Sequence, residues 1–155
     1  SLRRARLVRD LLVRTGVSHT LVVADGTAPP LAPASWDLVL VDAPCSGTGT
    51  VRRHPEIRWR FGPDAFPRLA ATQLSMLQSG LALLAPDGVL VYATCSLEPE
   101  ENEAIVAQVG GPYQVVSLDA LLPDGVPRLP TATGGVRLPT TRESDGFTIH
   151  ALGRV

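Results

Sequence analysis

The chain has 155 residues, which is enough for one domain. Its composition, with 45% hydrophobic and 19% charged residues, is ordinary for a soluble globular protein. Its 14 basic residues are all arginine and are balanced by 15 acidic ones, giving a net charge of −1. This balance excludes a general attraction to nucleic acid, so an RNA ligand would need a local basic patch. No apolar run approaches the roughly 20 residues of a membrane helix, and we expect a cytoplasmic protein.

The chain contains two cysteines. Two are too few for a zinc site built on cysteine, no histidine pair at metal spacing supports them, and a cytoplasmic location argues against a structural disulfide. We therefore expect no metal, and the neighbours of each cysteine carry more information than their number.

The first half of the chain predicts a helix followed by two strands. Apolar residues recur between arginines over residues 2–15, which predicts a helix that stops at Gly16. Residues 19–24 (HTLVVA) predict a short strand, and residues 36–41 (WDLVLV) predict a second one, apolar enough to be buried on both faces. Residues 51–67 contain three prolines and should be mostly irregular.

The second half begins with the clearest helix, over residues 68–84, where leucines recur at helical spacing. A helix of about ten residues should start near Pro99, with early glutamates suited to the positive end of its dipole. The remaining expected elements are a strand at 89–93, two late strands at 113–118 and 146–152, and a long loop at 123–145.

Chemically capable side chains stand where predicted strands end. Strands that alternate with helices predict an α/β sheet with parallel strands, and ligands of such sheets bind beyond the carboxyl ends of the strands. Asp25, Asp42, Cys45 and Cys95 all lie at or just after such an end. Both cysteines of the chain therefore fall on the expected active edge.

Two thiols at this edge suit attack on an electron-poor ring carbon. Carbon 5 of cytosine is too weak a nucleophile to take a methyl group until a thiolate has added to carbon 6. This chemistry needs an activated cysteine, an acid near ring nitrogen 3 and a second group that helps to release the product. A free thiol has a pKa of about 8.5, so the site must lower the pKa of the attacking cysteine.

Two motifs surround the cysteines. DAPCSGTG at 42–49 carries Asp42 and Cys45, and ATCS at 93–96 carries Cys95. The chain resembles the Sun (Fmu/RsmB) family of S-adenosylmethionine-dependent RNA cytosine-5 methyltransferases. The resemblance is carried by the segments around the two motifs, VLVDAPCSGTGTVRRHPEIRW and LVYATCSLEPEENE. The resemblance extends over nearly the whole length, to DGFTIHAL at 145–152.

The resemblance implies an α/β fold with a Rossmann-like class I methyltransferase sheet, mostly parallel with an antiparallel late strand. It also implies roles: Cys95 as the nucleophile, Cys45 as the residue that assists elimination, Asp42 beside cofactor and target base, and Asp25 on the adenosine part of S-adenosylmethionine. Position alone leaves the division between the cysteines open, because DNA cytosine methyltransferases use the cysteine of a comparable PC motif as nucleophile. The plainer alternatives are small buried cysteines and aspartates that form turns.

The family's Gly-rich cofactor loop and the acidic residue that ends its second strand precede the region that this chain resembles. We therefore expect residues 1–155 to be a partial catalytic domain, without the first two strands of the family fold and without an N-terminal RNA-binding domain. The isolated chain should then bind S-adenosylmethionine weakly or not at all, whereas the full-length parent should be active.

A basic segment, VRRHPEIRWR at 51–60, follows the first cysteine motif. Its candidate RNA-binding residues are Arg52, Arg53, His54, Arg58 and Trp59, because arginines bind phosphates and aromatic rings stack on unpaired bases. We favour 16S ribosomal RNA as the partner, with transfer RNA as the other candidate. The segment could instead be a solvated charged loop in which Trp59 packs against the protein.

Three other functions compete with methyl transfer. A dinucleotide-binding oxidoreductase would explain GTG after a strand, but Arg52 occupies the third glycine position. A cysteine hydrolase would pair Cys95 with His54 or His150 as base, and leaves DAPC without a role. A non-catalytic RNA-binding remnant that cannot bind cofactor stays open.

Overall fold

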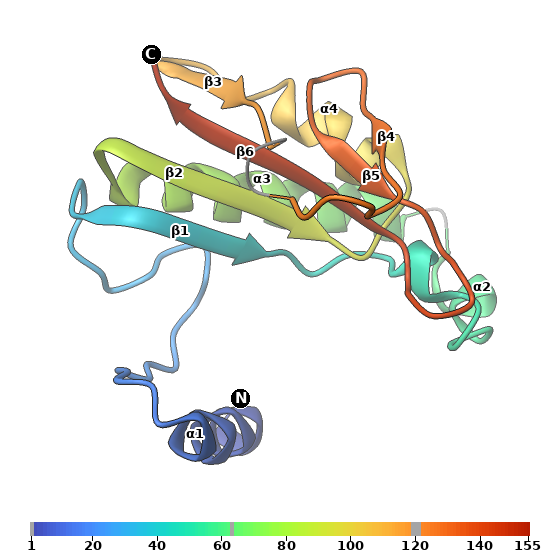
Figure 1. Cartoon of the computed structure of the whole chain (residues 1–155), viewed down its shortest axis with the longest axis horizontal. Helices are drawn as coiled ribbons and strands as arrows, with labels where there is room; N and C mark the ends of the chain where they lie inside the picture. Colours follow the sequence, from blue (N-terminus) through green and yellow to red (C-terminus); the bar gives the residue numbers. More distant parts are fainter. Residues whose placement is uncertain (1, 63, 119–121) are drawn as a thin grey trace.

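The structure is a computed structural model that describes residues 2–62, 64–118 and 122–155. A six-stranded mixed sheet forms its body, in the order β1-β2-β6-β5-β4, with β3 also paired to β6 (Figure 1). The elements in chain order are α1 (Leu2–Thr15), β1 (Trp36–Asp42), η1 (Thr48–Thr50), α2 (Ile57–Arg60), α3 (Ala65–Leu83), β2 (Leu84–Thr94), η2 (Pro99–Glu101), α4 (Glu103–Val106), β3 (Tyr113–Val116), β4 (Leu129–Pro130), β5 (Val136–Leu138) and β6 (Phe147–Arg154).

The core lies between α3 and the strands β1, β2 and β6. Leu77 and Leu81 lie one helical turn apart on the buried face of α3, and they pack against Leu90 and Tyr92 of β2. Figure 1 shows α3 and α4 behind the sheet, on the same side. The helix expected at 68–84 is thus confirmed, with its start three residues earlier.

β1 and β2 pair in parallel, and Asp42 stands opposite Ala93 at the carboxyl end of the pair. Both strands therefore deliver their following loops to the same edge of the sheet. β6 runs antiparallel to β2, β3 and β5. The α/β class is confirmed, and among the described residues the parallel pairing is confined to β1 and β2.

The two late strands are confirmed as β3 and β6, but residues 123–145 are more than a loop. They contain the short antiparallel strands β4 and β5. Gly134, with φ 81°, turns the chain between them, and Val136 of β5 is buried in a second apolar cluster with Leu118 and Ala151. Burial of Val136 explains why a segment rich in Gly, Pro and Thr still pairs as strands.

Residues 19–24 do not form a strand, contrary to the prediction. All six side chains are exposed, and no strand among the described residues lies beside them to complete a ladder. β1 was predicted to be buried on both faces, and this is wrong as well. Leu38 and Leu40 are 64% and 67% exposed because β1 is the edge strand and α3 covers its other face.

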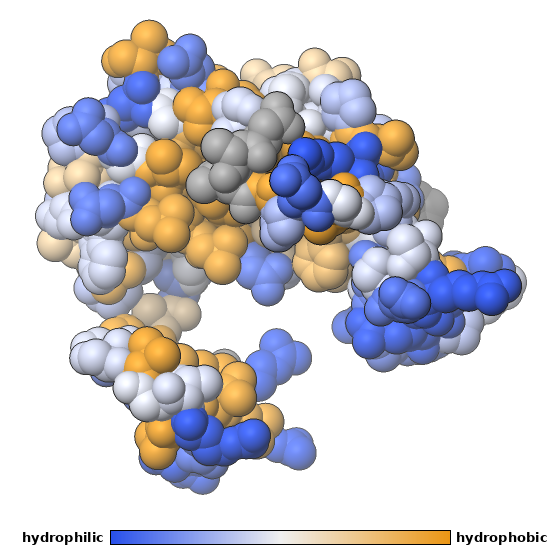
Figure 2. Space-filling model, viewed as in Figure 1, coloured by the Kyte–Doolittle hydropathy of each residue, from blue (hydrophilic) through white to orange (hydrophobic). Residues whose placement is uncertain are grey.

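The N-terminal helix α1 was predicted correctly, but it lies apart from the sheet (Figure 1). Figure 2 shows apolar side chains on its surface, and Leu7, Leu11 and Val13 are each more than half exposed. Of the described helices, none is both long enough and apolar enough to cross a membrane.

The helix expected near Pro99 is broken at Asn102 into η2 and the single turn α4. Asn102 leaves helical geometry, with φ −127° and ψ −87°. Its buried side-chain amide donates hydrogen bonds to the carbonyls of Ser96 and Glu98, while its oxygen accepts one from Thr94. The periodicity of the segment could not reveal these bonds, which anchor the turn after β2.

Candidate active site

Three segments that are distant in sequence meet at the carboxyl end of the β1–β2 pair. The backbone N–H of Gly49 donates to the carbonyl of Cys95 at 2.9 Å, and the N–H of Gly146 donates to the carbonyl of Gly49 at 2.9 Å. A side chain at Gly49 would collide with the backbone of Gly146 and Cys95. The loop after β1, the turn after β2 and the start of β6 are therefore held in close contact.

The two cysteines face each other across this junction. Their Sγ atoms lie 3.3 Å apart, and both side chains are half-buried. The hydrogen bond from Cys45 lowers the pKa of Cys95 to about 7. The same hydrogen bond, together with burial, raises the pKa of Cys45 above its ordinary value. When the pair loses one proton, the negative charge therefore lies on Cys95 and the remaining proton on Cys45.

A buried polar network supports the Cys45 loop from behind. Glu101 accepts hydrogen bonds from the backbone N–H of Ser46 at 2.9 Å, from the Ser46 hydroxyl at 2.5 Å and from the Gln73 amide at 3.0 Å. Ser46, Gln73 and Glu101 are all fully or nearly fully buried. The sequence pattern does not single out Glu101, because its run of glutamates equally suits the positive end of a helix dipole. Gln73, a polar residue on the apolar face of α3, was the available signal.

The turn after β2 is fixed by hydroxyl groups. The Ser96 carbonyl accepts a hydrogen bond from the Thr148 hydroxyl at 2.8 Å, and the Ser96 hydroxyl lies 3.3 Å from those of Ser46 and Thr48. Thr48 in turn accepts from the N–H of Leu97 at 3.0 Å. Ser96, which follows Cys95, is thus hydrogen-bonded both to the loop after β1 and to β6.

The two candidate aspartates lie in different places. Asp42 ends β1, three positions before Cys45, and its side chain is exposed at the same edge. Asp25 closes a local turn, in which its Oδ1 accepts from the N–H and the hydroxyl of Thr27 at 2.9 and 2.8 Å. These bonds lower the pKa of Asp25. Asp25 also borders a hollow of about 220 Å³, whose other lining residues are Val22, Ala24, Gly26, Pro29, Pro30 and Leu31.

The candidate RNA-binding residues differ in availability. Arg53 forms a two-pronged ion pair with Asp145, and this pair lowers the pKa of Asp145. The positive charge of Arg53 is therefore already balanced by a carboxylate. His54 lies 3.2 Å from Glu56. Arg52 and Arg58 are exposed, and Trp59 is 88% exposed. Trp59 is therefore not a packing residue.

Neither histidine of the hydrolase alternative contacts Cys95 in the described part of the chain. His150 is fully buried, and its Nε2 hydrogen-bonds with Thr131 at 3.1 Å and Thr133 at 2.8 Å. Burial lowers its pKa to about 4. His54 stands with Glu56 on the exposed loop. The arrangement gives Cys95 a thiol partner, whereas a hydrolase needs a base.

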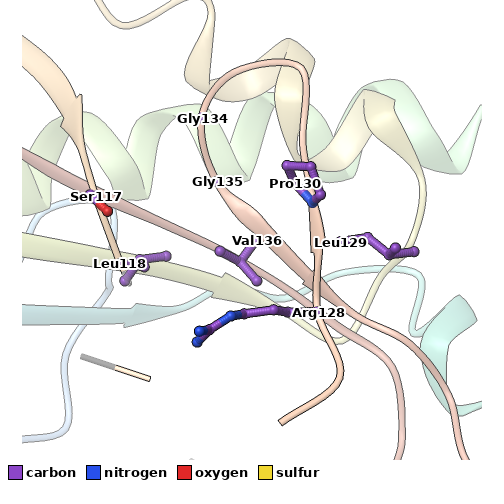
Figure 3. A pocket seen from close by; sticks show the side chains of 8 residues that line it. All are labelled: Ser117, Leu118, Arg128, Leu129, Pro130, Gly134, Gly135 and Val136. Atoms are coloured by element: carbon purple, nitrogen blue, oxygen red, sulfur yellow. The ribbon is translucent and has the colours of Figure 1, made fainter. Parts of the chain in front are cut away.

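A further hollow of about 260 Å³ opens between the chain after β3 and the β4–β5 hairpin (Figure 3). Leu118, Leu129 and Val136 line it together with Arg128. None of its lining residues belongs to the loops that carry the cysteines, so it is separate from the thiol pair.

The chain matches the model of the family described as 16S rRNA methyltransferase RsmB/F over residues 1–153. It is 39% identical over 151 residues to the ribosomal RNA small subunit methyltransferase B of Salmonella arizonae, covering 94% of this chain and 33% of that protein. The chain thus spans about a third of the length of this curated relative.

Two solved structures are similar over essentially the whole chain. The crystal structure of PH0851 has a TM-score of 0.85 at 30% identity, covering 99% of this chain and 35% of that one. The crystal structure of NSun6 from Pyrococcus horikoshii with SFG has a TM-score of 0.80 at 26% identity, covering 100% and 40%. With its paired cysteine motifs and this match, the chain belongs to the 16S rRNA methyltransferase RsmB/F family.

Proposed function

We propose that this chain supplies the catalytic thiol pair of an S-adenosylmethionine-dependent RNA cytosine-5 methyltransferase that acts on 16S ribosomal RNA. One observation carries the proposal. Cys95, whose pKa is lowered to about 7, lies 3.3 Å from the sulfur of Cys45 at the carboxyl ends of two adjacent parallel strands. A nucleophile paired with a hydrogen-bond donor is what addition to and release from a pyrimidine ring require.

In the proposed reaction the Cys95 thiolate forms a bond to carbon 6 of cytosine, and electron density moves to carbon 5. Carbon 5 would then take a methyl group, which S-adenosylmethionine would supply when bound, with cleavage of its methyl–sulfur bond. The carbon 5 proton then passes to a base, its electron pair re-forms the 5,6 double bond, and the carbon–sulfur bond breaks to return the thiolate. Cys45 assists this elimination, because its S–H hydrogen-bonds to the departing sulfur of Cys95.

The residues near Asp25 fit part of the cofactor. The aliphatic walls of the hollow beside Asp25, among them Val22, Pro29 and Leu31, suit the face of an adenine ring. The hydrogen bonds from Thr27 both go to Asp25 Oδ1, which leaves Oδ2 to accept a hydrogen bond from the exocyclic amine of adenine. Asp42, exposed beside the thiol pair, would face the methyl donor and the target base. The SFG bound to the archaeal NSun6 is an analogue of S-adenosylmethionine, which favours this cofactor.

The exposed basic segment would hold single-stranded RNA next to the thiol pair. Arg52 and Arg58 would bind phosphates, and Trp59 would stack on an unpaired base. A hollow of about 260 Å³ beside the Arg53–Asp145 pair, with Phe147 in its wall, is large enough for one flanking base. We assign to Arg53 mainly the role of fixing this wall.

We also propose that the chain is part of a larger catalytic domain. The curated relative is about three times as long, and the outer face and edge of β1 expose Leu38 and Leu40. The 155-residue chain should accordingly bind S-adenosylmethionine weakly or not at all. Micromolar binding in a calorimetric titration of this polypeptide would contradict the proposal.

Incubation with tritiated S-adenosylmethionine tests the function, using the 155-residue chain and a version extended upstream by its own gene. Bulk ribosomal RNA and transfer RNA are supplied separately. We expect the extended protein to methylate cytidine in ribosomal RNA, Cys95→Ala to abolish transfer, and Cys45→Ala to accumulate a covalent protein–RNA adduct. Transfer that survives Cys95→Ala would refute the assigned nucleophile. RNA binding by the extended protein without any transfer would favour the non-catalytic remnant.

A further inference from the structure

Glu101 is a fully buried carboxylate that hydrogen bonds alone hold within the described part of the chain. Its side chain accepts three hydrogen bonds, two from Ser46 and one from Gln73, and no arginine or histidine among the described residues bonds to it. Its own carbonyl accepts a hydrogen bond from the hydroxyl of the buried Tyr92 at 2.8 Å. A buried charge is costly unless hydrogen bonds hold it, so a position with this arrangement needs an explanation.

The bonds of Glu101 lead to both sides of one catalytic cysteine. Ser46, which follows Cys45, bonds to Glu101 through its backbone and its hydroxyl. The Gln73 amide bridges Glu101 to the carbonyl of Pro44, which precedes Cys45, at 3.0 and 2.9 Å. The Cys45 backbone is therefore fixed on both sides by one carboxylate. The thiol is left to point at Cys95.

We propose that Glu101 is a positioning residue for Cys45, which it holds in contact with Cys95 and keeps in its protonated form. The first part rests on the hydrogen bonds alone. The second follows from charge, since a buried carboxylate disfavours a second negative charge nearby. The catalytic consequence depends on the proposed function, whereas the state of the Cys45 thiol does not.

The groups around Cys45 agree with this role. Three titratable side chains lie around Cys45: Cys95 in the turn after β2, Tyr92 in β2 and Glu101 in η2. A fourth, Asp42, stands at the start of the loop that carries Cys45. Beside the hydrogen bond to Cys95 and burial, which dominate, the charge of Glu101 also raises the Cys45 pKa. The same charge raises the pKa of Cys95 as well, so the difference between the two cysteines comes mainly from the position in which Glu101 holds Cys45. A neutral Cys45 can donate to Cys95, whereas an ionised one could not.

Alkylation of the 155-residue chain tests the proposal without any methyl transfer. Wild type, Glu101→Gln and the control Glu103→Gln are treated with substoichiometric iodoacetamide at several pH values, and labelling of each cysteine is read by peptide mass spectrometry. Glu103 is the matched control because it is also largely buried, but its carboxylate bonds to Arg137. Circular dichroism establishes that each variant is folded.

We expect Glu101→Gln to raise the labelling of Cys45 relative to Cys95 by about threefold or more at mildly alkaline pH, and Glu103→Gln to leave the ratio unchanged. The glutamine keeps the size of the side chain, but it removes the charge and replaces one of the two acceptor oxygens with an amide donor. A folded Glu101→Gln chain with the wild-type labelling ratio at every pH would overturn the proposal. If Glu101→Gln does not fold, Ser46→Ala decides, because it removes the 2.5 Å bond and should also raise Cys45 labelling.

The extended protein with RNA supplies the catalytic readout. Glu101→Gln should accumulate the covalent adduct as Cys45→Ala does, and Glu103→Gln should not. If Cys45→Ala accumulates adduct while folded Glu101→Gln turns over like wild type, the positioning role is refuted. If no variant forms adduct or transfers methyl groups, the proposed function fails, and the alkylation ratio alone still decides the role of Glu101.

Discussion

The sulfur atoms of Cys45 and Cys95 lie 3.3 Å apart, although 50 positions separate the two residues in sequence. The parallel register of β1 and β2 brings them together, because Asp42 and Ala93 are opposite each other and each cysteine follows within a few residues. At this distance the two thiols titrate as one unit, and the second proton is much harder to remove than the first.

The first prediction concerns the pH at which Cys95 becomes reactive. Because its pKa is lowered to about 7, its alkylation rate should rise with pH and reach half its maximum near that value. Cys45→Ala removes the hydrogen bond that stabilises the thiolate, so the midpoint should move up towards the ordinary pKa of about 8.5. Stopped-flow alkylation or thiolate ultraviolet absorbance measures the midpoint. An unchanged midpoint would show that Cys45 does not set the charge of Cys95.

The second prediction concerns oxidation. A disulfide needs its sulfurs about 2.05 Å apart, so the pair has little distance to close. Treatment with diamide should remove two protons and two electrons from the thiols, form the Cys45–Cys95 bond and reduce the diazene to a hydrazine. Intact-mass analysis should show the loss of two hydrogens, reversed by dithiothreitol. The prediction fails if the oxidised wild-type chain still has both thiols free, and Cys45→Ala serves as the control.

The third prediction separates RNA binding from folding at Trp59. Its side chain is 88% exposed, so Trp59→Ala should leave the melting temperature almost unchanged. Loss of base stacking should weaken binding of single-stranded RNA by about 1–3 kcal/mol in the extended protein, as measured by fluorescence anisotropy. Trp36→Ala is the matched control, since Trp36 is also exposed, stands at the start of β1 away from the basic segment and donates to the Ala32 carbonyl. Equal RNA affinity for both variants would argue against stacking on Trp59.

The fourth prediction is acid destabilisation through His150. Burial lowers its pKa from 6.5 to about 4, so the unfolded chain binds more protons between these values. Stability from this group is therefore complete above about pH 6.5 and falls as the pH decreases towards 4, by about 3 kcal/mol in total. Urea unfolding at several pH values should show a weaker acid dependence for His150→Gln than for wild type. Parallel pH dependences would mean that His150 is not the group responsible.

Local sequence patterns predicted the elements that pack on the core. The helix α3 was predicted correctly because its buried leucines, among them Leu77 and Leu81, recur at helical spacing. The strand β2 was predicted correctly because Leu90 lies in a short apolar run that is typical of a buried strand. The same reasoning failed for residues 19–24 and for Leu40 of β1. Their composition is that of buried strands, but burial depends on a neighbour in space, which composition does not report.

The sequence motifs predicted the two cysteines of the candidate site but not the buried residues that support them. Cys45 and Cys95 were placed at one edge because parallel strands end together. Glu101 and Gln73 were not predictable as partners, because their link runs between η2 and α3, 28 positions apart, and is visible only in three dimensions. Arg53 was interpreted as an RNA ligand, and its ion pair with Asp145 depends on a contact 92 positions away.

The contact between Gly49 and Gly146 has a consequence for the order of assembly during synthesis. Gly146 and Thr148 stand at the start of β6, yet they bond to the backbone of both cysteine loops. A nascent chain cannot close these bonds until the ribosome has released β6, because the contacts join segments that lie 52 and 97 positions apart in the 155-residue chain. Until then the turn that carries Cys95 lacks its hydrogen bond from Thr148, so the site reaches its final geometry only when β6 has joined the sheet.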